Sequence, residues 1–77
     1  MILLSASIEE NIVLGRRQVT SSMLESAIEI SGVGTWVKAL PQGITTRVGE
    51  GGRPLSQGQC QMLALARALA GDPRILI

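Results

Sequence analysis

Leu55-Ser56-Gln57-Gly58-Gln59 is the stretch around which this sequence is organised, because an apolar helix is expected to run from it to about Ala70. Ser56 is a favourable N-cap residue, and Gln59 follows three positions later, which is the spacing of a capping box. Gly58 allows close approach to the first helical turn. A helix start with free N–H groups, the positive end of a dipole and a nearby hydroxyl suits phosphate. Taken alone, an ordinary capped helix after a glycine-rich turn would be the simpler interpretation.

Length and composition exclude several functional classes. The chain has 77 residues, and a chain of this size buries only about 60% of its unfolded surface, so one small domain is the upper bound. A single cysteine, Cys60, and no histidine leave no intramolecular disulfide and no obvious set of metal ligands. A net charge of +1 and a single aromatic residue, Trp36, argue against a nucleic-acid surface. No apolar run approaches the roughly 20 residues that span a bilayer.

The first half of the chain predicts a cluster of short helices. Ser7 to Glu10 is a second capping box, which opens a helix to about Leu14 that Gly15 ends. Thr20 is the expected N-cap of a helix to Ser31, with Gly32 as its stop. The buried side of that helix is expected to carry Met23 or Leu24, Ala27, Ile28 and Ile30. Between the two helices, we expect Arg16-Arg17-Gln18 to form a solvated linker.

The second half combines one more short helix, a loop and the long apolar helix. Residues 36–40 predict one or two helical turns before Pro41, with Trp36 as a core anchor. Ile44 to Pro54 is rich in glycine, which predicts an irregular loop that contacts a partner through its backbone. The helix from Ser56 is apolar nearly all round and is expected to lie inside a larger body. Strand-like segments are expected at Ile2 to Leu4 and at Arg74 to Ile77.

Three stretches together resemble the ATP-binding cassette (ABC) ATPases. Residues 55–59, followed by Leu63-Ala64-Leu65-Ala66-Arg67-Ala68-Leu69 and by Asp72-Pro73-Arg74-Ile75-Leu76-Ile77, resemble the family signature L-S-G-G-Q, its helix A-x-A-R-A-L and the strand after N/D-P. One departure is Gln57, which stands where the family usually has its first glycine. Residues 46–52 resemble T-x-V-G-E-x-G, the X-loop of ABC exporters. Further matches to the segment after the family's Q-loop are Ser7, Ile8, Asn11 and Ile12.

The resemblance implies a fold that is mainly α: the helical subdomain of a P-loop ABC ATPase, with short strand-like terminal segments. Residues 1–77 would then be a partial ABC ATPase domain that lacks the Walker A motif, the Q-loop glutamine, the Walker B acids and the switch histidine. The parent family hydrolyses ATP with Mg²⁺ to drive transport. We expect this chain alone to bind neither ATP nor Mg²⁺ tightly and to have no ATPase activity.

The resemblance also assigns sites and partners. Two nucleotide-binding domains would dimerise head to tail, and the signature of each would contact in trans the γ-phosphate of ATP held by the other. The ATP-contacting residues would be Ser56, Gln57, Gly58 and Gln59. Glu50, flanked by Gly49 and Gly51, would meet the coupling helices of a transmembrane domain at the cytoplasmic face of the membrane. Neither a catalytic residue nor a metal ligand of its own is expected, and the transported substrate is set by membrane helices outside these motifs.

Other interpretations remain open at this point. The signature is shared with ABC ATPases of DNA maintenance, although the X-loop match and the neutral charge favour an exporter. A non-catalytic helical interaction module, left by natural truncation or by deliberate shortening, is a third class. A glutamine at position 57 could weaken the site if that position needs a positive φ, or be harmless if its side chain points away. Apolar terminal segments also predict some self-association of the chain.

Overall fold

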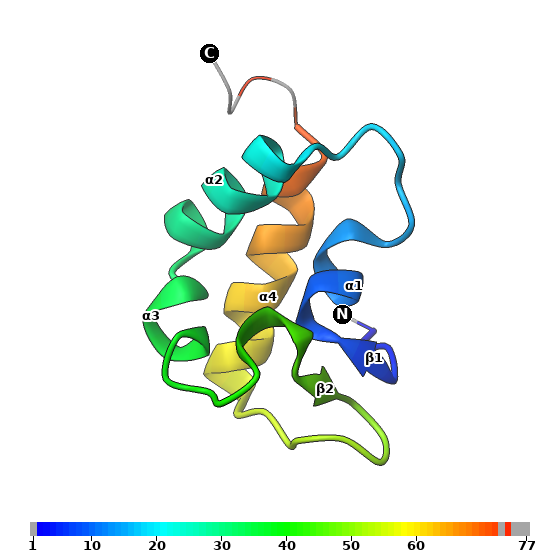
Figure 1. Cartoon of the computed structure of the whole chain (residues 1–77), viewed down its shortest axis with the longest axis vertical. Helices are drawn as coiled ribbons and strands as arrows, with labels where there is room; N and C mark the ends of the chain where they lie inside the picture. Colours follow the sequence, from blue (N-terminus) through cyan, green and yellow to red (C-terminus); the bar gives the residue numbers. More distant parts are fainter. Residues whose placement is uncertain (1, 73, 75–77) are drawn as a thin grey trace.

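The computed structural model describes residues 2–72 and residue 74, and it shows a mainly helical fold with one very small sheet (Figure 1). This confirms the expected fold class. The strand expected at the C-terminal end lies outside the described residues, except for Arg74. In chain order the elements are β1 (Ala6–Ser7), α1 (Ile8–Val13), α2 (Ser21–Ser31), α3 (Gly34–Val37), the 3-10 helix η1 (Gly43–Thr45), β2 (Arg47–Val48) and α4 (Gln57–Ala70).

Helix α4 is the centre of the fold, with α2 packed on one side of it and α1 on the other (Figure 1). Leu63, Ala66 and Ala70 form its buried stripe, at the helical spacing of three and four residues. The small alanine side chains allow the neighbouring helices to approach closely. The core that results contains Ile8, Ile12, Leu24, Ala27, Val33, Val37, Val48, Leu63, Ala66 and Ala70. Trp36 packs against this core while staying half-buried, which confirms its expected role as an anchor.

The helix starts lie where their caps predict them. Ser7 and Ser56 each make a complete capping box, and the Thr20 hydroxyl accepts a hydrogen bond from the Met23 N–H at 3.2 Å. The end of α1 differs from the prediction. Leu14 itself takes the left-handed conformation, with φ of 54°, and its N–H donates to the Glu10 carbonyl. The helix therefore ends before Gly15, which has a positive φ as well.

Four other expectations are corrected. Ile30 was expected on the buried side of α2 but is 59% exposed, because the packed stripe runs instead through Leu24, Ala27 and Ser31. Helix α3 spans Gly34–Val37, so it begins two residues before and ends three residues before the expected range of 36–40. The segment from Ile44 to Pro54 is not irregular throughout, since β2 pairs antiparallel with β1, Ala6 opposite Val48 and Ser7 opposite Arg47. The N-terminal strand thus lies at Ala6–Ser7 and not at Ile2 to Leu4.

Candidate functional site

The start of α4 is built by a reciprocal pair of hydrogen bonds. The Gln59 N–H donates to Ser56 Oγ at 3.0 Å, and the Ser56 N–H donates to Gln59 Oε1 at 2.9 Å. Ser56 has an extended backbone, with φ −68° and ψ 163°, so its carbonyl already accepts from the Cys60 N–H. The capping box therefore satisfies two of the four N–H groups that a helix start leaves free.

The other two N–H groups, those of Gln57 and Gly58, have no partner within the part of the chain that the structure describes. Both residues are exposed, and a Cβ added to Gly58 would have only Ser56 Oγ nearby, at 3.9 Å. No residue that the structure describes covers the start of α4. An open hollow of about 300 Å³ lies beside it, lined by Gln57, Cys60, Gln61 and Ala64. The two free N–H groups and the positive end of the α4 dipole are thus accessible to an anionic group from another molecule.

Gln57 causes no backbone strain at this site. It is the first residue of α4 and is helical, and Leu14 is the one non-glycine residue with a positive φ among those described. The possibility that position 57 requires a glycine conformation is therefore not supported by this backbone. What distinguishes Gln57 from glycine here is its exposed side chain at the edge of the hollow.

The loop around Glu50 is held against the N-terminal segment of the chain. Gly49 and Gly51 have positive φ values of 80° and 81°, and the Ser5 hydroxyl donates to the Glu50 carbonyl. A Cβ at Gly49 would lie 2.7 Å from the Leu4 carbonyl oxygen, so no other residue fits that contact. The loop is thereby fixed while the Glu50 side chain remains exposed.

Asn11 and Arg67 form a polar contact between α1 and α4, and neither was identified from the sequence as a functional residue. Asn11 is completely buried, and its side-chain amide bonds to Leu4, Ser7 and Arg67. Arg67 is the one charged residue of α4 and reaches across to α1. The available signal was a polar residue inside the apolar face of one helix and a cation within another apolar helix.

Arg16 does not belong to a solvated linker, whereas Arg17 and Gln18 are exposed as expected, so the expectation was wrong for Arg16 alone. Its half-buried guanidinium donates to the Val13 and Ile12 carbonyls at 2.9 and 2.7 Å and to the Arg67 carbonyl at 2.8 Å. These oxygens belong to the last turns of α1 and α4, where helix carbonyls lack partners and a positive charge is favourable. Arg16 therefore joins two helix ends.

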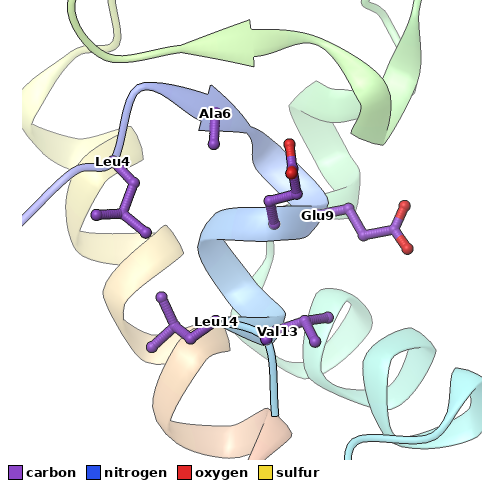
Figure 2. A pocket seen from close by; sticks show the side chains of 7 residues that line it. Leu4, Ala6, Glu9, Val13 and Leu14 are labelled. Atoms are coloured by element: carbon purple, nitrogen blue, oxygen red, sulfur yellow. The ribbon is translucent and has the colours of Figure 1, made fainter. Parts of the chain in front are cut away.

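An open groove of about 420 Å³ runs beside α1 and contains none of the predicted site residues (Figure 2). Its lining is Leu4, Ala6, Glu9, Glu10, Val13, Leu14 and Gly15. Hydrogen bonds from the backbone and hydroxyl of Ser7 lower the pKa of Glu10. No cluster of three metal-ligating side chains occurs in residues 2–72 and 74. The same described part of the chain contains no helix long and apolar enough to cross a membrane.

Curated proteins that are similar in sequence to this chain are ABC transporters. No family model matches the chain. It is 43% identical over 76 residues to ABC transporter B family member 21 of Arabidopsis thaliana, covering 99% of this chain and 6% of that relative. It is 43% identical over 75 residues to P-glycoprotein 14 of Caenorhabditis elegans, covering 97% and 6%, respectively. For the mitochondrial ATP-binding cassette sub-family B member 10 of Mus musculus, identity is 42% over 79 residues, covering 99% and 11%.

The structural comparison agrees. The solved structure of a bacterial Atm1-family ABC exporter with ATP bound matches with a TM-score of 0.81 and 35% identity, over 94% of this chain and 13% of that one. The chain spans about 6% of the length of the first curated relatives that it matches. Sequence and fold together show that the chain belongs to the family of exporter-type ATP-binding cassette transporters, of which it matches one short, mainly helical segment.

Proposed function

We propose that this chain forms the signature-bearing part of the ATPase of an ABC exporter and contacts, in trans, ATP held by a second nucleotide-binding domain. The observation that carries the proposal is the start of α4, where the capping box leaves the Gln57 and Gly58 N–H groups exposed. Ser56 Oγ, the Gly58 N–H and the dipole of α4 would stabilise the γ-phosphate. Gln59 would maintain this geometry through its bond to the Ser56 N–H.

The 77 residues contain no G-x-x-x-x-G-K-[ST] motif, so in this proposal the phosphates are bound by a P-loop outside them. In this proposal, the P-loop of the second domain holds ATP and Mg²⁺, and the signature completes the site from the opposite side. ATP then favours the closed dimer because it contacts both subunits, and its hydrolysis favours reopening. The chain alone is expected to show no ATPase activity.

The loop around Glu50 would contact the coupling helices of a transmembrane domain at the cytoplasmic face of the membrane. Its support is geometric: Gly49 and Ser5 hold the backbone of the loop, while the Glu50 carboxylate is exposed. A fixed backbone with an exposed charge suits recognition of a partner better than a mobile loop would.

A chimeric exporter tests the trans contact. Residues 1–77 would replace the matched segment of P-glycoprotein 14, and ATPase rates would be measured in membranes. We expect Ser56→Ala to lower kcat about tenfold or more, as loss of a preorganised donor does. Ser7→Ala is the matched control, since Ser7 makes the same type of capping box on α1. An ATPase rate insensitive to Ser56→Ala, or equally lowered by Ser7→Ala, would refute the proposal.

Apolar side chains on the surface lead us to expect self-association of the isolated chain. Ile2 is 75% exposed and Leu65 is 48% exposed, and in the proposal such side chains pack against neighbouring parts of the exporter. Sedimentation velocity across a wide concentration range should show association that grows with concentration. A single monomeric species throughout would contradict this expectation.

A further inference from the structure

We propose that Asn11 and Arg67 are positioning residues that join the signature helix and the Glu50 loop into one rigid body. A displacement of α4 caused by phosphate at Ser56 would then displace the Glu50 loop by the same rigid-body motion. This inference rests on the proposed function. It adds to that function the residues that connect α4 to the Glu50 loop.

The Asn11 side chain uses all of its hydrogen-bonding capacity. Oδ1 accepts from the Leu4 N–H at 2.8 Å and from Arg67 Nη2 at 3.3 Å. Nδ2 donates to the Leu4 carbonyl at 3.0 Å and to the Ser7 carbonyl at 2.9 Å. An amide has two donor hydrogens and two acceptor lone pairs, so each is occupied, and the residue is fully buried. Such a buried and fully satisfied network defines one arrangement of the segments that it joins.

Arg67 connects this amide to the signature helix. Its Nε donates to the Asn11 backbone carbonyl at 2.9 Å, while Nη2 reaches the Asn11 side chain. The guanidinium thus contacts the backbone and the side chain of the same residue from one rigid fork. Apolar packing between α1 and α4 is non-directional and permits small sliding motions. The two bonds from Arg67 oppose such sliding because hydrogen bonds weaken steeply when they are misaligned.

The segment that Asn11 holds is the one on which the Glu50 loop rests. Leu4 is bonded through both its N–H and its carbonyl to Asn11, and the same carbonyl lies against Gly49. Ser5 makes two hydrogen bonds to the loop. Its hydroxyl donates to the Glu50 carbonyl, and its backbone carbonyl accepts from Arg47 Nη2 at 2.9 Å. The chain of contacts therefore runs without a gap from α4 through Asn11 to the loop.

Amide hydrogen exchange on the 77-residue chain tests the local part of the inference. Asn11→Ala should raise exchange about tenfold or more at the Ile8 N–H, bonded to the Thr46 carbonyl, and at the Arg53 N–H, bonded to the Arg47 carbonyl. The amides of α2 should keep their protection. Gln61→Ala, an exposed polar truncation on α4, is the matched control. Equal acceleration of all amides, as simple destabilisation would cause, or no acceleration at the two reporters, would overturn the inference.

Transport per ATP hydrolysed tests the functional part in the chimeric exporter. Asn11→Ala should lower that ratio about fivefold while the ATPase rate stays within about twofold, a change typical of altered coupling. Arg67→Lys should also lower the ratio of transport to hydrolysis, because one ammonium group cannot reproduce the two directed donations of the guanidinium. If hydrolysis depends on Ser56 but the ratio is unchanged in Asn11→Ala, the proposed function stands and the positioning role fails. If hydrolysis does not depend on Ser56, the proposed function itself fails.

Discussion

Replacing Arg16 by methionine isolates a contribution to stability that only the tertiary structure discloses. The variant keeps much of the aliphatic stem but removes three charge-assisted donations, to the carbonyls of Ile12, Val13 and Arg67. Bonds of this type contribute about 1.5–3 kcal/mol each when fully buried. Arg16 is half-buried, and water can replace part of what is lost, so we expect the free energy of unfolding to fall by about 2–3 kcal/mol in total.

Urea titration followed by Trp36 fluorescence measures this change, because the single tryptophan packs against the core and its Nε1 donates to Met62 Sδ. With an m-value of about 1 kcal/mol/M for a chain of this size, the midpoint should fall by about 2–3 M. Trimethylamine N-oxide in all samples would keep the variant folded at the start of the titration. Arg17→Met is the matched control, since Arg17 is exposed and makes no hydrogen bond within the described residues, and it should change the midpoint little.

A double-mutant cycle with Gly71 sharpens the test. A Cβ at Gly71 would collide with Arg16 Nη1, whereas the φ of Gly71, −90°, is open to alanine. Gly71→Ala should therefore destabilise the wild-type chain by about 1 kcal/mol or more and be nearly neutral beside Arg16→Met. Strict additivity of the two substitutions, or an Arg16→Met midpoint equal to that of Arg17→Met, would refute the assignment of Arg16 as the bridge between the two helix ends.

Two further predictions concern the loop and the C-terminal turn. Gly49→Ala should cost clearly more unfolding free energy than Gly51→Ala, about 2–3 against about 1 kcal/mol, because both have a positive φ but only Gly49 lies against Leu4; equal midpoints in urea would contradict this. Hydrogen bonds from the Arg74 guanidinium lower the pKa of Asp72 from 3.8 to about 2. Any stability from this pair is therefore present above pH 4 and lost as the pH falls through about 2. NMR titration of the carboxyl should show Arg74→Gln returning the pKa of Asp72 towards 3.8, and an unchanged value would exclude the pair.

The sequence by itself determined the family and the starts of α1, α2 and α4, whereas α3 begins at Gly34, two residues earlier than expected. Ser7, Thr20 and Ser56 cap their helices as predicted, because a capping box depends only on residues three positions apart. The capped and exposed start of α4 was predictable for the same reason. Boundaries that depend on glycine alone were less certain, as the end of α1 at Leu14 shows.

Only the tertiary structure decided what the polar residues of the interior do. Arg16 and Arg67 lie 51 positions apart in the sequence, yet the guanidinium of one bonds to the carbonyl of the other. Asn11 meets Arg67 across 56 positions, and Ser5 meets Glu50 across 45. Local sequence patterns do not predict such partners. Hydrogen bonds between distant segments form only after the apolar faces of α1, α2 and α4 have brought those segments together.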